Sequence, residues 1–203
     1  MTFSAVLVAN GLQPKNEKIL KVLTKASKII CIDNGYELIN KLEITGDLLI
    51  GDLDSVNLSK VKKETKIIRD DDQNTNDLEK ALNYCLNKKI TEITILGATG
   101  GRDDQYLANI LIAIDFIDNL KIEILSDEYS IKFSNGTKKF YCDPMSHISL
   151  ISLDKNNIIT TNGLKYDLIN SKLSSSTHGI SNIALKKEFT ISSKMPLIVF
   201  KKL

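Results

Sequence analysis

The stretch EITILGATGGRDDQYLANILIAIDF, residues 92–116, runs from a short apolar segment through a glycine-rich loop into a segment of helical period. Residues 92–96 are largely β-branched or apolar, which is typical of a buried strand. The second part places apolar residues at the spacing of one helix face, namely Leu107, Ile110, Leu111 and Ile114. A strand followed directly by a helix is half of a βαβ unit, so this stretch predicts a parallel sheet.

The same alternation extends from Phe3 to about Ser126. Further strands are predicted over residues 5–8, 28–32, 48–50, 66–69 and 121–125. A second helix is predicted over residues 77–87, with one apolar face made of Leu78, Ala81, Leu82 and Cys85. After Asp127 no helical period remains, and turn signals such as Asn135-Gly136 separate short strands. We therefore expect an α/β domain over residues 1–126 and an all-β domain, a small sandwich or barrel, over residues 127–203.

The composition restricts the class of protein. Apolar residues make up 42% of the chain and charged residues 26%, as in soluble globular proteins. The 27 Lys and Arg nearly balance the 25 Asp and Glu, so no basic field for nucleic acid is expected. The longest apolar run, residues 107–114, is far shorter than the ~20 residues of a membrane span. Residues 1–11 resemble a first strand rather than a signal peptide, and the three separated cysteines favour reduced, buried thiols. The expected location is the cytoplasm.

Four acidic or glycine-rich segments each follow a predicted strand: residues 33–35, 51–55, 70–77 and 97–105. Ligands of open parallel sheets bind at the carboxyl ends of the strands, so these four loops should converge on one crevice. Carboxylates gathered there would repel one another without a cation, and oxygen ligands without Cys or His favour Mg²⁺. The glycines let backbone N–H groups approach phosphate, which Arg102 can bind in a bidentate way.

Each segment alone has an ordinary structural interpretation, as a tight turn, a helix cap or a solvated charge run. Asp103, for example, is expected to cap the helix or to face water. Only the coincidence of all four segments at one sheet edge favours a magnesium and phosphate site.

Four motifs carry a resemblance to a known family. GDLDS at residues 51–55 is similar to a GDxDS motif, and DQNTNDL at residues 72–78 to a DQxxTDL segment. GGRDDQYLAN at residues 100–109 is similar to GGRxDxxLAN, and GISN at residues 179–182 to a GxSN signature. In this order, and over most of the chain, they resemble the thiamine pyrophosphokinase family.

The resemblance implies an N-terminal Rossmann-like parallel-sheet domain, a C-terminal β-sandwich and a homodimer with its active sites between subunits. It implies transfer of pyrophosphate from ATP to thiamine, in which the thiamine hydroxyl attacks the β-phosphorus and AMP departs. Residues 1–126 would bind ATP and Mg²⁺, and residues 127–203 would bind thiamine and form the dimer.

The matched positions imply roles for individual residues. Those that would hold Mg²⁺ and the triphosphate are Asp52, Asp54, Asp77 and Asp104, with Arg102 stabilising charge on the transferred group. The ATP cleft would also include Asp33, Gln73, Gly100, Gly101 and Gln105. Ser181 and Asn182 would bind thiamine.

The chain departs from the family pattern at three points. Asn76 replaces a threonine, although asparagine also caps helices well. Asn34 replaces a small residue and would tolerate a left-handed backbone. The chain has no tryptophan, which some members use near thiamine; Tyr166 is a candidate substitute, but a buried core position is the expected one.

Two other functions fit parts of the sequence. Residues 52–56 also match the DxDx[TV] motif of haloacid-dehalogenase-type phosphatases, in which Asp52 would form an aspartyl phosphate. That alternative leaves Gly100, Gly101 and Arg102 unexplained, and it expects a later lysine and acidic pair on βα units where this chain has β segments. The second alternative is a non-enzymatic nucleotide sensor, for which four clustered carboxylates would be unusual.

Overall fold

The computed structural model describes residues 3–175 and 177–203, so Met1 and Thr2 of the predicted N-terminal segment lie outside the described residues. The chain divides into two compact units, Met1–Asp127 and Glu128–Leu203, called here the N-terminal and C-terminal units.

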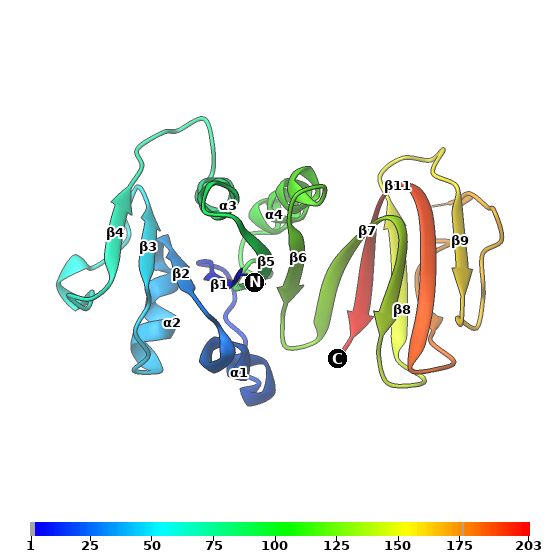
Figure 1. Ribbon diagram of the computed structural model, residues 1–203, viewed down its shortest axis with the longest axis horizontal. Helices are drawn as coiled ribbons and strands as arrows, with labels where there is room; N and C mark the ends of the chain where they lie inside the picture. The colour runs from blue at the N-terminus through cyan, green and yellow to red at the C-terminus, as the bar shows by residue number, and fades with distance from the viewer. Residues whose placement is uncertain (1–2, 176) are drawn as a thin grey trace. The chain divides into compact units, whose positions relative to one another are not determined.

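The N-terminal unit is built on a parallel sheet in the order β6–β5–β1–β2–β3–β4 (Figure 1). Its strands are β1 (Phe3–Val8), β2 (Ile29–Ile32), β3 (Leu48–Gly51), β4 (Lys66–Arg69), β5 (Ile90–Leu96) and β6 (Lys121–Leu125). β2 and β3 are buried along their whole length. Their continuous apolar runs suit a sheet that is covered on both faces.

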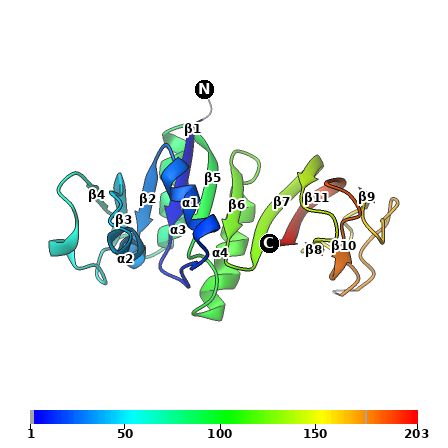
Figure 2. The same ribbon diagram turned by 90° about the horizontal axis from the view of Figure 1, so that it is seen from below.

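Helices lie on both faces of this sheet. They are α1 (Glu17–Lys25), α2 (Tyr36–Lys41), α3 (Asp77–Asn87) and α4 (Asp103–Phe116), with 3₁₀ turns at η1 (Asp33–Gly35) and η2 (Leu58–Lys60). Figures 1 and 2 together show α1 and α2 against one face and α3 and α4 against the other. No helix in the described part of the chain is both long and apolar enough to cross a membrane.

The predicted inner face is confirmed for α3, whereas for α4 it is right at Ile110 and wrong at Leu107 and Leu111. In α3 the four residues expected to be buried are buried. In α4 Leu107 is 59% exposed and Leu111 is 39% exposed, whereas Ile110, Ala113 and the following Ile117 are buried. Because residues 107–114 are apolar almost all round, several stripes fit the helical period, and packing on the sheet selects the one at 110, 113 and 117.

The strand order creates the place for a site. The chain moves from β1 outward through β2 and β3 to β4, and α3 then leads back to β5 on the other side of β1. The order therefore reverses between β1 and β5. The loops that leave these two strands diverge, which opens a crevice at their carboxyl ends.

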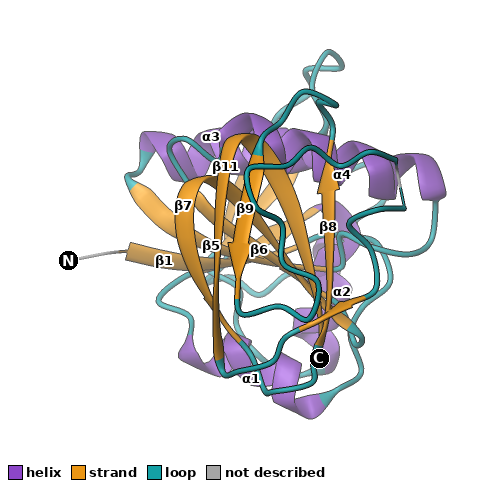
Figure 3. Ribbon diagram, turned by 90° about the vertical axis from the view of Figure 1, so that its right-hand side faces the viewer, coloured by secondary structure: helices purple, strands orange, loops and turns teal. Residues whose placement is uncertain are grey.

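The C-terminal unit consists of antiparallel strands (Figure 3). They are β7 (Tyr129–Tyr141), β8 (His147–Ser152), β9 (Ile159–Asn162), β10 (Asn182–Ile183) and β11 (Glu188–Lys202). The pairing of β11 with β7 breaks between Ser193 and Leu197; before the break β11 also pairs with β9, and after it with β8. Apolar side chains from both halves of β11 share one core, which includes Phe140, Ile148, Phe189 and Leu197. The predicted fold class, a parallel α/β domain followed by an all-β domain, is confirmed.

Candidate active site

A cavity of about 710 Å³ lies at the carboxyl ends of β1, β2 and β5, where the strand order reverses. Its lining comes from the segment after β1, from Asp33 after β2, from the start of α3, and from the glycine-rich loop with the first turns of α4. The predicted residues Asp33, Asp77, Gly100, Gly101, Arg102 and Gln105 all contribute to this lining. The cavity is thus formed by segments that are far apart in the sequence.

The glycine-rich loop is tied to its neighbours through its carbonyl groups. The backbone N–H of Gly11 donates to the Gly97 carbonyl (2.7 Å), and that of Leu12 donates to the Thr99 carbonyl (2.9 Å). From α4, the Asn109 amide donates to the Ala98 carbonyl (3.0 Å). A Cβ at Gly97 would lie 2.4 Å from the Ala9 carbonyl oxygen, and its φ of +67° also favours glycine. The loop is therefore held close to β1 and leads into the N-terminus of α4, an anion-favouring position.

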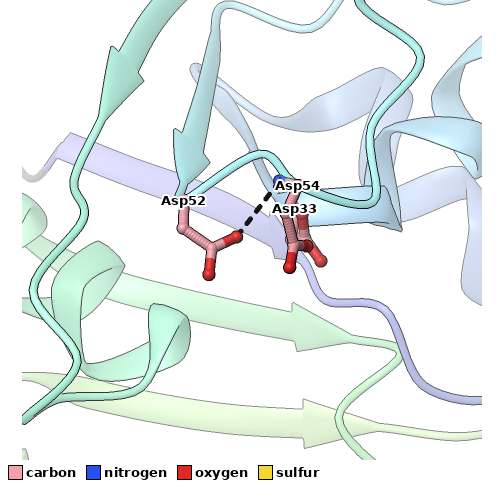
Figure 4. Close-up of side chains that lie close together, drawn as sticks. All are labelled: Asp33, Asp52 and Asp54. Atoms are coloured by element: carbon pink, nitrogen blue, oxygen red, sulfur yellow. Dashed lines mark hydrogen bonds between the residues drawn. The ribbon is translucent and has the colours of Figure 1, made fainter.

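Three carboxylates meet beside this cavity. One oxygen each of Asp33, Asp52 and Asp54 lies within 4.8 Å of the others, as Figure 4 shows. Asp33 stands in η1 after β2, whereas Asp52 and Asp54 follow β3. The Asp52 carboxylate accepts a hydrogen bond from the Asp54 backbone N–H (3.2 Å), and the Ser55 hydroxyl donates to Asp33 Oδ2 (2.6 Å). We call Asp33, Asp52 and Asp54 the carboxylate cluster.

The backbone bends sharply at this cluster. Asp33 has a φ of +48° and Leu53 a φ of +64°, both in the left-handed region that few non-glycine residues adopt. The left-handed residue after β2 is thus Asp33 itself, and not Asn34 as the sequence suggested. Strain of this kind persists where the surrounding structure fixes it, often at functional sites.

The carboxylate cluster fits a magnesium ion. Asp33 Oδ1 is buried and has no hydrogen-bond partner among the described residues. Three negative groups at this spacing repel one another, and a cation would remove both the repulsion and the unmatched oxygen. Oxygen ligands alone are the set that Mg²⁺ prefers.

Asp77, the first residue of α3, adjoins the carboxylate cluster. Gly51 lies between Asp77 and Asp33: a Cβ at position 51 would lie 3.4 Å from Asp77 Cγ and 3.5 Å from Asp33 Cβ. Burial raises the pKa of Asp77; Lys80 opposes this, and the charges of Asp52 and Asp33 add to it. Asn76 caps the helix as expected, because its side-chain oxygen accepts the Glu79 N–H (2.9 Å). Asp77 is therefore a partly buried carboxylate at the edge of the cluster.

Lys80, which contacts Asp77, is a residue of this site that sequence reasoning missed. Its ammonium donates to Asp77 Oδ1 (3.1 Å) and to the Asp70 carbonyl (2.8 Å), and its side chain is only 5% exposed. Burial lowers the pKa of Lys80, but the hydrogen bond and the charges of Asp77, Asp70 and Asp52 outweigh burial and raise it. The only sequence signal was its spacing, three residues after Asp77 on a helix.

Arg102 and Asp104 form an exposed ion pair at the N-terminus of α4. The Arg102 guanidinium donates to both oxygens of Asp104, at 3.1 and 2.6 Å. This hydrogen bonding lowers the pKa of Asp104 and raises that of Arg102. Among the described residues, Asp104 does not belong to the carboxylate cluster. Gln73 is exposed and makes a long hydrogen bond to the Asp71 carbonyl (3.4 Å).

In the C-terminal unit Ser181 and Asn182 have different environments. Ser181 is exposed, has a φ of +59°, and its backbone N–H donates to the Ser149 hydroxyl (3.1 Å). Asn182 is only 8% exposed; its amide accepts from the Tyr166 N–H (3.1 Å) and donates to the Tyr166 carbonyl (2.8 Å). Tyr166 itself is 63% exposed, so its expected core position is wrong. Leu164 takes the buried place in this turn instead, and Asn182 fixes the backbone of Tyr166 at the surface.

Two family models match the chain. The model described as "Thiamin pyrophosphokinase, catalytic domain" matches residues 19–125, and "Thiamin pyrophosphokinase, vitamin B1 binding domain" matches residues 128–198. The chain is 28% identical to the thiamine pyrophosphokinase of Bacillus subtilis over 159 residues, which is 73% of this chain and 74% of the relative. It is 26% identical to thiamin pyrophosphokinase 1 of Caenorhabditis elegans over 138 residues, which is 62% of this chain but only 57% of the longer relative.

Solved structures share the fold. A thiamine pyrophosphokinase from Bacillus subtilis superposes with a TM-score of 0.83 at 24% identity, covering 98% of both chains. The yeast thiamin pyrophosphokinase gives a TM-score of 0.83 at 17% identity, covering 99% of this chain and 86% of that one. At these identities the likeness concerns the fold.

Proposed function

Because the chain belongs to the thiamin pyrophosphokinase family, a family of transferases, we propose that it transfers the terminal pyrophosphoryl group of ATP to thiamine, giving thiamine diphosphate and AMP. The observation that supports this reaction best is the position of the carboxylate cluster. It lies beside a cavity whose other wall is a glycine-rich loop and a helix N-terminus. A magnesium-bound polyphosphate requires carboxylates that hold the cation and, next to them, backbone N–H groups that bind the phosphate oxygens.

The N-terminal unit would bind ATP and Mg²⁺. In this proposal Mg²⁺ is held by Asp52, Asp54 and Asp77, and Asp33 joins them because the structure gives it a buried oxygen without a partner. A bound Mg²⁺ supplies charge neutralisation on the phosphate oxygens. Gly100, Gly101 and Gln105 would contact the polyphosphate from the cavity wall, and Gln73 would approach from the neighbouring loop.

Arg102 would stabilise negative charge on the transferred group, which is the main catalytic demand of phosphoryl-type transfer. Its guanidinium is paired with Asp104, so phosphate binding has to compete with that carboxylate. Both groups are exposed, so the exchange costs little. Asp104, once released, would be available to the metal and its water ligands.

The C-terminal unit would bind thiamine and form a homodimer in the cytoplasm. Ser181 is the residue proposed to contact thiamine, because it is exposed. Asn182 would act by holding the backbone of Tyr166, as its hydrogen bonds indicate.

The reaction is tested by incubating purified protein with ATP and thiamine, with and without Mg²⁺, and separating the products by chromatography. Equal amounts of thiamine diphosphate and AMP, formed only with Mg²⁺, are the expected result. Formation of ADP would indicate a simple kinase instead, and free phosphate without thiamine diphosphate would indicate a phosphatase.

The dimer is tested by complementation. If each active site combines the N-terminal unit of one subunit with the C-terminal unit of the other, then mixing inactive Asp52→Asn with Ser181→Ala restores one intact site in each mixed dimer. The mixture is assayed at thiamine concentrations far below the raised KM of Ser181→Ala, where that variant alone turns over little substrate. Mixtures that stay as inactive as their components, although light scattering shows exchanged dimers, would contradict a shared site. A monomer by light scattering would contradict the dimer itself.

A further inference from the structure

We propose that Lys80 is a positioning residue of the metal site, which holds Asp77 and the end of β3 in fixed relation. This inference rests on the proposed function, because it concerns the same bound Mg²⁺. Lys80 is not itself a proposed metal ligand. Its buried side chain lies on the inner face of α3 and contacts the Asp77 carboxylate.

The burial of Lys80 is the first observation. A buried ammonium is costly unless charged or polar groups surround it closely. Lys80 meets this condition by bonding to the Asp77 carboxylate and the Asp70 carbonyl. Both bonds are directed at the segments that carry the proposed metal ligands, and neither merely caps the helix that bears the lysine.

The second observation is a continuous chain of hydrogen bonds. The Asp70 backbone N–H donates to the Gly51 carbonyl (2.9 Å), so Asp70 is bonded to the residue that precedes Asp52. The Asp70 carbonyl accepts from Lys80, and Lys80 donates to Asp77. Lys80 therefore connects the end of β3 with the start of α3. Two proposed ligands, Asp52 and Asp77, are kept in register through this connection.

The third observation concerns the use of the carboxylate oxygens. Lys80 binds Asp77 Oδ1, which leaves Oδ2 for a cation. Without Lys80, Asp77 could rotate, and repulsion from Asp33 and Asp52 would turn it away from the cluster. A metal ligand whose orienting partner is removed typically loses ~10–100-fold in metal affinity.

The test measures metal-dependent binding without turnover. The probe is α,β-methylene-ATP, which cannot be cleaved at the bond that the reaction breaks, titrated calorimetrically at several Mn²⁺ concentrations. Lys80→Met keeps the length of the side chain but removes its charge and donors. We expect the Mn²⁺ concentration that gives half-maximal binding to rise about 10-fold or more in this variant.

A matched control is Lys62→Met. Lys62 is half-buried, less than Lys80, and donates to two backbone carbonyls, those of Glu43 (3.0 Å) and Ile44 (3.1 Å), away from the carboxylate cluster. It should lower thermal stability without changing the Mn²⁺ dependence. An equal shift in both variants would mean that Lys80 acts only through general stability.

A double variant keeps the inference testable if Lys80→Met does not fold. Asp77→Asn combined with Lys80→Met leaves no unpaired buried charge. Because Lys80 acts in part through Asp77, Lys80→Met should shift the Mn²⁺ dependence less in the Asp77→Asn background than in the wild type. An equal shift in both backgrounds would overturn the inference, as would wild-type or tighter metal dependence in Lys80→Met. If wild-type binding did not depend on Mn²⁺ at all, the metal site of the proposed function would be wrong as well.

Discussion

Replacing Asp52 by Asn should stabilise the metal-free protein while removing most of its activity. At 4.8 Å, the upper limit for the cluster oxygens, two unit charges repel by about 0.9 kcal/mol in water and about 3.5 kcal/mol at an effective dielectric constant of 20. Asp54 is exposed, so the lower value is the better guide. Asn at position 52 removes two such repulsions and keeps an oxygen for the Asp54 N–H.

Part of this gain is offset, because Asp52 also attracts Lys80. A net gain of about 1 kcal/mol corresponds to a rise of roughly 2–4 °C in the midpoint of thermal unfolding for a chain of this size. Ligands act in the opposite sense. Mg²⁺ and ATP at 100 times their dissociation constant stabilise a protein by about 2.7 kcal/mol, and the variant should lose most of that increment.

The assay is thermal unfolding followed by circular dichroism, first in EDTA and then with Mg²⁺ and ATP, beside the turnover measurement. The variant should unfold at a higher temperature than the wild type in EDTA and at a lower temperature than the wild type with Mg²⁺ and ATP. Its turnover should fall by about 100-fold or more. Asp103→Asn is the control, since this carboxylate is exposed in the first turn of α4 and its loss should cost less than about 1 kcal/mol in both conditions. A metal-free Asp52→Asn protein that is less stable than wild type, or an activity close to normal, would refute the reasoning.

Other predictions follow from single contacts. Gly35→Ala should cost about 3 kcal/mol in urea unfolding, because the new Cβ would lie 2.1 Å from the Val8 carbonyl oxygen; unchanged stability would contradict that contact. Asn182→Ala should cost about 1–3 kcal/mol by leaving the Tyr166 backbone groups unpaired, whereas Ser181→Ala should leave stability unchanged and raise the KM for thiamine alone. In native protein, Ellman's reagent should modify Cys142 first, because burial raises the pKa of Cys31 and of Cys85 to about 12; a fast phase that persists in Cys142→Ser would disprove this order.

The sequence was sufficient to predict the strands β1 to β6 of the N-terminal unit and two of its helices, α3 and α4, but α1 and α2 were not predicted. Residues 48–50 and 66–69 fall within β3 and β4 because short runs that contain Leu and Ile between turn signals have few other structures open to them. Which face of α4 is exposed could not be predicted, because its segment is apolar almost all round and several helix faces could therefore pack on the sheet. Strand order was equally out of reach, since it depends on where α3 crosses the sheet and not on any local pattern.

The candidate site shows the same division. In any parallel sheet the loops that follow the strands lie at the same edge. The carboxylates of Asp33, Asp52 and Asp54, which stand in two of these loops, do lie close together. Which carboxylates lie within reach of one ion is a matter of ångströms, which motifs do not specify. Asp104, two residues from Arg102, pairs with it, while Lys80 became visible only once the fold placed it beneath Asp77 and Asp70.

The GISN segment, residues 179–182, shows why a motif and a ligand contact have to be separated. A Cβ at Gly179 would lie 2.2 Å from the Leu150 carbonyl oxygen, so folding of the C-terminal unit alone requires glycine there. Asn182 is buried and bonded to the Tyr166 backbone, so folding alone explains it too. Ser181, exposed and in a left-handed conformation, has no comparable structural explanation. Of these three residues, Ser181 is therefore the one whose replacement can distinguish a thiamine site from a turn that merely completes the β unit.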